Sequence, residues 1–344
     1  MGHAVKPFRV LMLTQADLVP PEEAENEEQI NRAPWRTDYD VRNALRELGH
    51  EVIVSGADAS LDQLRAELDD AKPDIVFNLL EMFAQRSEFL SHVLSYLELR
   101  GQPYTGCNPV GMSFSVRKPL QRKILRHHRI ATPEFAVARM DKPFRRPNRL
   151  QFPLIVKSIS EHGSVGISQA SVVTSDERLA DRIAFVHEHV GTDALVEEFI
   201  EGRELYVGVL GNTRLTALPI WELGFDNLRD GAPNIATSRL KWDVDEQERV
   251  GLTTGPAAAL DDPTRQRIAR LCKRAFRALE QNGYARFDIR LRPPGQPVII
   301  ESIPNPELAC NSEVPAAAKA GGLDYPKLLT RILSLGRQWS DRFA

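Results

Sequence analysis

The chain has 344 residues, of which 42% are hydrophobic and 26% charged, and its formal net charge is −3. This balance is typical of a globular protein of two or three domains and excludes a global basic field for nucleic acid. The three cysteines lie far apart, which argues against a disulfide framework and a zinc site. We find no apolar run near the roughly 18 residues of a membrane span and no signal-peptide pattern, so the sequence predicts a cytoplasmic protein without membrane or nucleic-acid partners.

The first third of the chain alternates predicted strands with predicted helices. Strands are expected at 8–14, 51–55 and 74–81. Apolar residues recurring every three or four positions predict helices between them, one of them at about 61–71. The acidic, proline-bearing stretch 17–35 shows no period and is predicted to be a long loop. Such alternation is typical of a parallel α/β sheet, and this first domain is expected to end near residue 103.

The rest of the chain is predicted to be a mixture of antiparallel strands and helices. The first expected elements are a strand, glycine loop and strand over 154–172 and a helix at 176–190. A strand, turn and strand follow over 194–211, and the segment 213–223 extends that sheet. A long helix is expected at 264–281, then two strands within 284–308 and a last helix from about Tyr325.

Two acidic residues interrupt the late predicted strands. Asp288 lies in ARFDIRL, and Glu301 ends the apolar run PVIIES. If these strands are neighbours, two carboxylates about 4 Å apart repel by about 4 kcal/mol at an effective dielectric constant near 20. Arg286 and Arg290 would offset that charge in a structural ion-pair cluster, and an amphipathic strand with a solvated polar face is the simplest alternative. Mg²⁺ would offset it too, with the Asn305 side-chain carbonyl as a further hard oxygen ligand.

The middle of the chain holds candidates for phosphate binding. Lys157 ends an apolar strand, and Gly163 and Gly166 in the following loop allow close approach of backbone N–H groups to phosphate oxygens. A flexible hairpin with an exposed lysine is the alternative. In LVEEFIEGREL, Glu197 and Glu198 precede a turn, which indicates either an exposed hairpin or a nucleotide hinge whose backbone bonds adenine and whose carboxylate takes the ribose hydroxyls.

Taken together, these motifs resemble a known family. Lys118, VKSISEHGSVGIS, VEEFIEGRELYVGVLG, ARFDIRL and VIIESIPNP occur in the order found in ATP-grasp ligases, and PYTGCNP and GGLDYPKLL resemble D-alanine–D-alanine ligases in particular. The resemblance covers about 70–340. It implies an α/β ATP-grasp fold with an N-terminal Rossmann-like domain at 1–103, a central ATP-grasp subdomain with the glycine flap at 104–197, and a C-terminal subdomain with the metal site at 198–344.

The resemblance also implies roles for single residues. Arg286 resembles the arginine that stabilises the tetrahedral oxyanion, and Ser312 the serine that receives the acceptor carboxylate. Asp288, Glu301 and Asn305 correspond to the metal ligands. For the ATP phosphates, the implied ligands are Lys118, Lys157 and Lys241, together with Ser164 and Val165 of the 160–166 flap. For adenine they are Glu197, Glu198, Phe199 and Ile200. Glu204 is the implied ligand of the ribose.

The implied activity is that of an ATP-dependent carboxylate–amine ligase. A substrate carboxylate attacks the γ-phosphate of ATP, and an amine then displaces phosphate from the acyl phosphate. Two Mg²⁺ ions are expected, for which Mn²⁺ can substitute. The expected partners are a small carboxylic acid and an amino acid, with a peptide as the alternative acceptor, and analogy with the family implies a homodimer.

Three departures from the family pattern bear on the substrate. Ile303 stands where the ligases have a metal-binding asparagine, which leaves a nucleotide-binding module without turnover as a second hypothesis. In the flap, His162 and Gly163 replace a glycine and a serine that contacts substrate. The region 15–38 lacks the glycine-rich loop that holds the first D-alanine. Asp38, Asp40 and Glu81 are acids without an assigned role, and D-alanyl-D-alanine is not the expected product.

Overall fold

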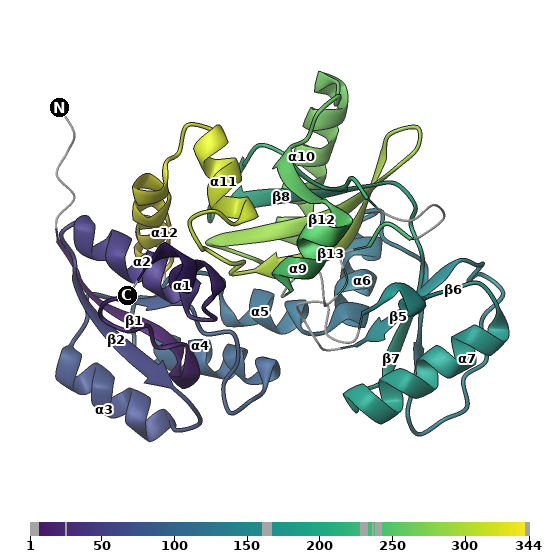
Figure 1. The fold of residues 1–344 in the computed structure, drawn as a ribbon. Helices are drawn as coiled ribbons and strands as arrows, with labels where there is room; N and C mark the ends of the chain where they lie inside the picture. Colours follow the sequence, from purple (N-terminus) through teal and green to yellow (C-terminus); the bar gives the residue numbers. More distant parts are fainter. Residues whose placement is uncertain are drawn as a thin grey trace.

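A computed structural model describes residues 7–24, 26–159, 167–227, 233–235, 237 and 243–340. This part of the chain forms a three-stranded, a four-stranded and a six-stranded sheet. Figure 1 shows the N-terminal sheet and its helices on the left, the six-stranded sheet in the centre and the four-stranded sheet on the right. The mixture of sheets and helices confirms the predicted α/β class.

The N-terminal sheet is parallel, with the strand order β2–β1–β3. Its elements are β1 (Arg9–Gln15), α1 (Glu27–Arg32), α2 (Arg36–Glu47), β2 (Glu51–Ala57), α3 (Leu61–Ala71), β3 (Ile75–Asn78) and α4 (Leu90–Leu99), with short 3-10 turns at Ala16–Leu18 and Ser87–Phe89. Successive strand side chains point to opposite faces. Val10 and Met12 therefore pack in the cluster that contains α2, whereas Leu11 and Leu13 pack in the cluster of α3 and α4.

Two expectations for this region were wrong in part. The third strand ends at Asn78 rather than at residue 81, because the Asn78 side chain accepts a hydrogen bond from the Leu80 N–H and turns the chain. The stretch 17–35 is not loop throughout, since α1 begins after Asn26. The Asn26 side chain caps this helix by accepting from the Gln29 N–H, and acidic residues fill its first turn.

The four-stranded sheet has the order β4–β7–β5–β6, and every pairing in it is antiparallel. Its elements are β4 (Phe135–Ala138), β5 (Leu154–Ser158), a 3-10 turn (Gln169–Ser171), β6 (Val172–Val173), α7 (Asp176–Phe185) and β7 (Ala194–Glu198). The helix predicted at 176–190 is α7, continued by a π-helical turn at Val186–Val190. Apolar side chains of α7 and the strands form one core cluster.

The six-stranded sheet runs β11–β10–β8–β12–β13, with β9 paired to β8. Its elements are β8 (Arg203–Leu210), β9 (Thr216–Ala217), β10 (Trp221–Phe225), α9 (Val244–Val250), β11 (Leu252–Pro256), α10 (Asp262–Ala278), β12 (Tyr284–Arg292) and β13 (Gln296–Pro304). The long helix α10 buries Ile268, Cys272 and Phe276 against one face of the sheet. The predicted pairing of the two late strands is confirmed, because β12 and β13 are antiparallel neighbours.

The segment 194–211 is not a hairpin, because its two strands belong to different sheets. β7 lies in the four-stranded sheet and β8 in the six-stranded sheet, so the chain crosses between them after Glu198. Gly202 makes the crossing possible with a φ of 137°. A Cβ atom at this position would collide with the Leu291 carbonyl oxygen. The exposed-hairpin interpretation was therefore wrong.

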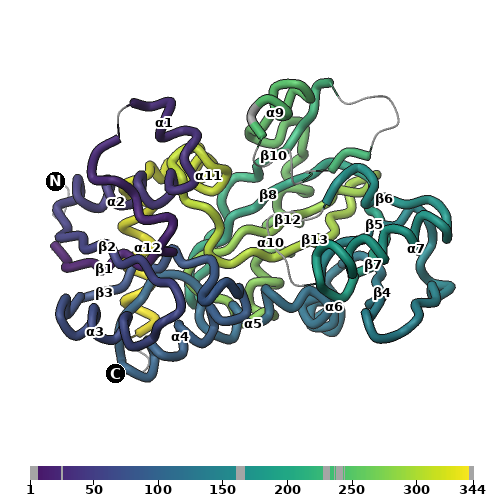
Figure 2. Tube along the Cα trace, turned by 60° about the horizontal axis from the view of Figure 1, so that its bottom comes forward, coloured from purple at the N-terminus to yellow at the C-terminus, as the bar shows by residue number. Residues whose placement is uncertain are grey.

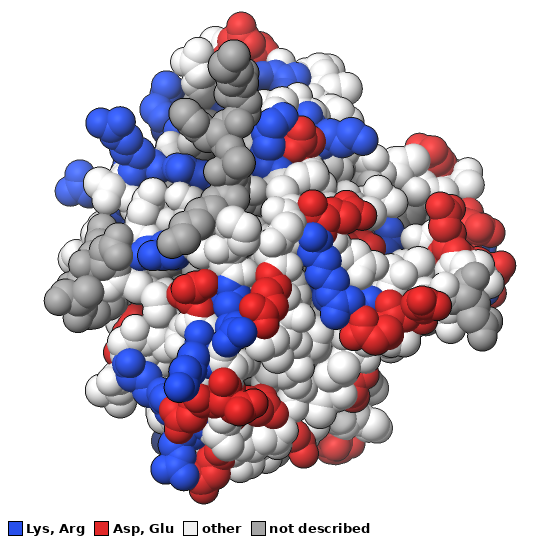
Figure 3. All heavy atoms as spheres, turned by 90° about the vertical axis from the view of Figure 1, so that its left-hand side faces the viewer, with Lys and Arg blue, Asp and Glu red and all other residues white. Residues whose placement is uncertain are grey.

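Helices connect the three sheets, and the last helix packs against the N-terminal sheet. α5 (Pro109–Ser115) and α6 (Lys118–His127) lead from the N-terminal part to the two larger sheets, and α11 (Glu313–Ala320) and α12 (Tyr325–Ser340) follow β13. Leu328, Leu329 and Ile332 of α12 join the core cluster of β1 and α2. Figure 2 shows α12, in yellow, beside the purple N-terminal strands. Basic and acidic side chains share the face seen in Figure 3.

Candidate active site

The two acids of β12 and β13 lie directly opposite each other. Asp288 pairs with Glu301 in the antiparallel register, and the register then shifts, so that Ile289 faces Ile299. Ile300 is thus the extra residue of a β-bulge immediately before Glu301, and such bulges re-aim neighbouring side chains. The side chains of Asp288 and Glu301 are 14% and 19% exposed. The register therefore places the two acidic residues on one face of the sheet, which is the arrangement that the sequence analysis assumed when it weighed their repulsion.

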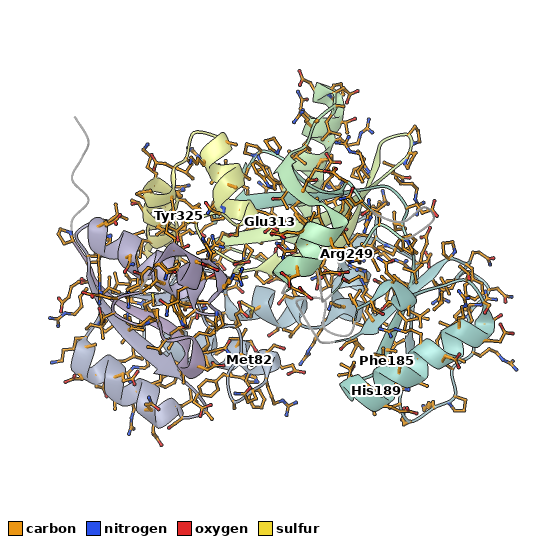
Figure 4. All side chains as sticks on the ribbon, viewed as in Figure 1. Met82, Phe185, His189, Arg249, Glu313 and Tyr325 are labelled. Carbon is orange, nitrogen blue, oxygen red and sulfur yellow. The ribbon has the colours of Figure 1, made fainter. Side chains whose placement is uncertain are left out.

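Separate cations offset these two carboxylates. Arg286 donates to both oxygens of Asp288, at 2.8 and 3.1 Å, and also to Glu313 at 3.2 Å. Its guanidinium carbon lies 4.5 Å from the centre of the Tyr206 ring. Burial alone would lower the pKa of Arg286, but the two carboxylates outweigh burial and raise it. Glu313 is labelled in Figure 4, on α11 beside the sheet.

Lys118 is the cation beside Glu301. It begins α6, is 4% exposed, and its Nζ lies 3.4 Å from Glu301 Oε1. Burial lowers the pKa of Lys118, Glu301 opposes this shift, and the positive charge of Lys157 adds to it. The two predicted phosphate lysines are therefore near enough to repel each other although they lie on different elements. A nearby anion would stabilise two buried positive charges that repel each other.

Lys157 shares a buried carboxylate with an arginine. Its Nζ lies 2.6 Å from Glu197 Oε2, and Arg122 Nε donates to Glu197 Oε1 at 2.7 Å. The Glu197 side chain is 1% exposed. Burial would raise the pKa of this carboxyl, but Arg122 and Lys157 outweigh burial and lower it to about 2. The carboxylate predicted for the adenine hinge is thus committed to two cations of the protein.

The remaining hinge residues lie at the crossing between the sheets. The N–H groups of Glu198 and Phe199 donate to the Glu134 and Pro153 carbonyls, so the sheet already uses them. Ile200 is 3% exposed. A hinge that bonds adenine through these two N–H groups is therefore incompatible with the observed hydrogen bonds.

Glu204, the predicted ribose carboxylate, is held by β12 and by its own strand. Arg290 Nη2 donates to Glu204 Oε2 at 2.6 Å, and the Tyr206 hydroxyl donates to Oε1 at 2.9 Å. Arg290 also donates to the carbonyls of Gly202 and Asn234. The expectation that Arg290 offsets Asp288 and Glu301 was wrong, because its ion pair is with Glu204.

Asn305 is turned away from the metal-ligand role that its spacing suggested. Its Oδ1 accepts a hydrogen bond at 2.8 Å from the N–H of Cys107, in the PYTGC segment. Its Nδ2 finds no hydrogen-bond partner within the described ranges, and an amide nitrogen is a donor rather than a metal ligand. Ile303 faces Arg286 in the register and supplies no oxygen. Within the described residues, no group of three or more His, Cys, Asp or Glu is arranged to hold a metal.

Other predicted residues lie outside the described residues or are engaged locally. Ser164 and Val165 of the flap and Lys241 fall outside the described residues. Ser312 precedes α11, and its hydroxyl donates to the Ala309 and Glu307 carbonyls instead of capping the helix.

The unassigned acids of the N-terminal part have different surroundings. Glu81 is exposed, whereas Asp38 is 3% exposed and accepts a hydrogen bond from the Thr14 hydroxyl at 2.5 Å. Asp40 accepts from the Cys310 N–H at 2.9 Å. Burial raises the pKa of Asp38 to about 6. The hydrogen bond from Thr14 opposes this increase, and the negative charge of Glu81 adds to it. A strongly perturbed carboxyl at the end of a parallel sheet is a candidate for substrate contact.

We expect Asp38→Asn to stabilise the protein at pH 8. The carboxyl has a pKa of about 6 when folded and 3.8 as its ordinary value, so its charge opposes folding above pH 6 and has no effect below about pH 4. The neutral amide still accepts from Thr14, and the free energy of unfolding should rise by about 1–3 kcal/mol. Urea unfolding at pH 8 and pH 4 tests this, with exposed Asp62→Asn as control. An equal effect at both pH values would contradict the assignment.

Two residues of the site escaped sequence reasoning in part or in full. Arg122 was not singled out, although it follows Lys118 by four positions on a predicted helix and therefore shares its face. Arg290 was singled out as an ion-pair partner of Asp288 and Glu301, but its partner is Glu204. In both cases the partner lies on another element, 75 residues away for Arg122 and 86 for Arg290. Helical spacing would have drawn attention to Arg122, but nothing local indicates Glu197 as its partner.

Comparison with known proteins bears on the family to which the chain belongs. Residues 124–334 match the family model described as D-ala D-ala ligase C-terminus. The chain is 34% identical over 293 residues to a D-alanine–D-alanine ligase of Bordetella petrii, which covers 83% of this chain and 84% of that protein. It is 30% identical over 313 residues to an uncharacterized protein, y4sG, of Sinorhizobium fredii, with 89% of each chain covered.

Solved structures share the fold. The structure of the D-alanine–D-alanine ligase of Bacillus anthracis complexed with ATP matches with a TM-score of 0.74 at 20% identity, over 98% of this chain and 100% of that chain. The enzyme of Coxiella burnetii matches with a TM-score of 0.70 at 18% identity, over 97% and 95%. The ATP-grasp fold that the motifs implied is thereby confirmed. The chain belongs to the D-alanine–D-alanine ligase family of ATP-grasp proteins.

Proposed function

We propose that the protein is an ATP-dependent carboxylate–amine ligase that works through an acyl phosphate. The observation that carries this proposal is the meeting of Lys118 with Glu301, across the junction between α6 and the six-stranded sheet, within electrostatic reach of Lys157. Two buried lysines beside two opposed carboxylates suit a nucleotide triphosphate bound with Mg²⁺. A relative with this fold has been solved with ATP.

Lys118 and Lys157 are proposed to bind the phosphates, with Ser164 and Val165 of the flap and Lys241. Residues 197–200 would lie beside adenine, and Glu204 would take the ribose hydroxyls once it exchanges its bond with Tyr206. We also propose that the domains divide at residues 103 and 197 and that the protein forms a homodimer. No helix in the described residues has the length and apolar character needed to cross a bilayer.

Asp288 and Glu301 suit Mg²⁺, which takes some of its ligands from water and substrate, better than they suit a metal ion whose ligands all come from the protein. Two opposed carboxylates, with no third acidic, His or Cys ligand grouped beside them in the described ranges, match an ion that keeps waters and takes substrate phosphates as ligands. Bound there, Mg²⁺ would neutralise charge on the phosphates. Because Ile303 supplies no oxygen and Asn305 bonds Cys107, we propose that the second of two ions is held weakly.

The side chains suggest how the reaction proceeds. Lys118 and Lys157 hold the phosphates so that a substrate carboxylate can attack the terminal phosphorus in line. Arg286 lies on the same sheet face beside Asp288 and would stabilise the oxyanion that forms when the amine attacks the acyl phosphate, a contribution typically of about 3–4 kcal/mol. Ser312 would need to release the Glu307 and Ala309 carbonyls to bind an acceptor carboxylate.

The substrates are proposed by class only. A small carboxylic acid and an amino acid remain the first choice, and a peptide acceptor is the alternative. A screen for ATP-dependent phosphate release against pooled amino acids and small carboxylic acids tests the proposal, alongside calorimetric titration with ATP and Mg²⁺. Phosphate release with one pool would support a ligase. Tight nucleotide binding without release in any pool would favour a binding module, and absence of nucleotide binding would refute both.

We expect Ile303→Asn to lower the Mg²⁺ concentration needed for half-maximal nucleotide binding several-fold. The added amide oxygen stands two residues after Glu301 on the same strand face and can serve as a hard ligand. Titration of Mg²⁺ at fixed ATP gives this midpoint. Ile303→Leu serves as the matched control, because it keeps the apolar volume without an oxygen. If the asparagine variant needs as much Mg²⁺ as the leucine variant, Ile303 does not lie at the metal.

A further inference from the structure

Arg122 lies where three elements of the protein meet. It belongs to α6, is 1% exposed, and is among the largest fully buried side chains described. One nitrogen, Nε, donates to Glu197 on β7, and another, Nη2, donates to the carbonyl oxygen of Ile300 on β13. A guanidinium presents its donors in a rigid planar fork, so these two bonds set the distance between the partners.

The Ile300 carbonyl is available to Arg122 because of the β-bulge. The register passes from Asp288 opposite Glu301 to Ile289 opposite Ile299, so Ile300 has no partner residue on β12. β13 is also the last strand of its sheet. A partly buried carbonyl without a ladder partner needs another donor, and Arg122 supplies it. The residue that follows directly is Glu301, so Arg122 holds the bulge that presents this carboxylate.

Glu197 transmits the same constraint to the phosphate side of the site. Its two oxygens are divided between Arg122 at 2.7 Å and Lys157 at 2.6 Å. With Arg122 on Oε1, the carboxylate cannot rotate to give both oxygens to Lys157. Lys118 lies four residues before Arg122 on α6 and contacts Glu301. One helix face therefore contacts both the metal-side acid and the carboxylate that holds the second lysine.

We propose that Arg122 is a positioning residue for nucleotide binding. It places Lys157 through Glu197 and places Glu301 through the Ile300 carbonyl, so that the lysine of one sheet and the acid of the other stand at a fixed separation. This inference rests on the proposed function. Lysine at this position would keep the charge beside Glu197, but a single ammonium on a flexible stem cannot hold both partners in one geometry. Without the guanidinium of Arg122, both oxygens of the Glu197 carboxylate also become available to Lys157.

We expect Arg122→Lys to weaken ATP binding in the presence of Mg²⁺ by about tenfold, the lower end of the effect of groups that orient a site's ligands. Calorimetric titration measures this without any knowledge of the other substrates. Arg182→Lys is the matched control, because Arg182 is also buried, at 8% exposure, and its guanidinium donates to the Ser171 hydroxyl and lies over the Phe185 ring, on elements that hold none of the proposed nucleotide ligands. The control should keep wild-type ATP affinity, while thermal unfolding reports the stability change in each variant.

A double-mutant cycle separates positioning from a general loss of structure. If Arg122 acts on the nucleotide partly through Glu197 and Lys157, Arg122→Lys should weaken ATP binding clearly less in the Lys157→Met background than in the wild type, because coupled residues are not additive. The effect that remains in that background measures the second route, through the Ile300 carbonyl and Glu301. Full additivity with Lys157→Met, or wild-type affinity in Arg122→Lys, would overturn the inference. If the wild-type protein failed to bind ATP with Mg²⁺ at all, that result would count against the proposed function instead.

Discussion

Replacing Asp288 by asparagine should lower ATP-dependent phosphate release by about 10²–10³-fold, the usual cost of removing one group that stabilises developing charge. The change keeps the shape of the side chain but removes the negative charge opposite Glu301. It also breaks the two-pronged bond with Arg286, which then keeps Glu313 as its carboxylate partner. One substitution would therefore weaken both the proposed metal side and the proposed oxyanion side of the candidate site.

A matched control exists for this experiment. Asp141 follows an arginine by two positions, as Asp288 does, and lies 3.5 Å from Arg139, but its side chain is 64% exposed. Asp141→Asn should therefore retain wild-type phosphate release. Circular dichroism and titration with ATP and Mg²⁺ check that the Asp288 variant is folded and show whether nucleotide binding is lost with turnover. Wild-type phosphate release by Asp288→Asn would remove this residue from the site.

Replacing Glu197 by glutamine should have the largest effect on stability. The substitution leaves two buried cations, Arg122 and Lys157, without their shared carboxylate, and breaking a buried pair by removing one partner typically costs about 3–5 kcal/mol. The folded pKa of about 2 lies below the ordinary value of 4.5, so this contribution is complete above pH 4.5 and is lost as the pH falls toward 2. Urea unfolding at pH 7 measures the difference.

The neighbouring glutamate provides the comparison. Glu198 lies 2.6 Å from Arg292, but both side chains are more than 30% exposed, and such surface pairs contribute only about 0–1 kcal/mol. Glu198→Gln should therefore unfold near the wild-type urea concentration. Equal destabilisation by the two substitutions would show that the charge of Glu197 is not what stabilises this part of the protein. A Glu197 variant with wild-type stability would have the same meaning.

Local pattern predicted most of the elements. Leu64 and Leu68 in α3, and Ile268 and Cys272 in α10, recur at helical spacing and are buried as that spacing requires. The sequence also suggested that the two late strands are neighbours, and the structure pairs them with Asp288 opposite Glu301. These features depend on residues that are close along the chain, and short-range geometry is enough to determine them.

The crossing after Glu198 and the short helix α1 did not follow from periodicity. The sequence pattern of strand, glycine turn and strand is the same whether the two strands pair with each other or belong to separate sheets. Only the long-range pairing of the strands distinguishes these arrangements. α1 has six residues, too few for a periodic signal, although its Asn26 cap and acidic first turn were visible in the sequence.

The sequence by itself singled out four charged groups of the candidate site, because motif order and strand alternation point to Lys118, Lys157, Asp288 and Glu301. Only the tertiary structure decided how these groups are paired. The carboxylate of Glu197 is divided between Arg122 and Lys157, and Glu204 is held by Arg290. The physical reason is that a buried charge must find a partner, and which partner is within reach depends on how the two larger sheets and α6 pack together.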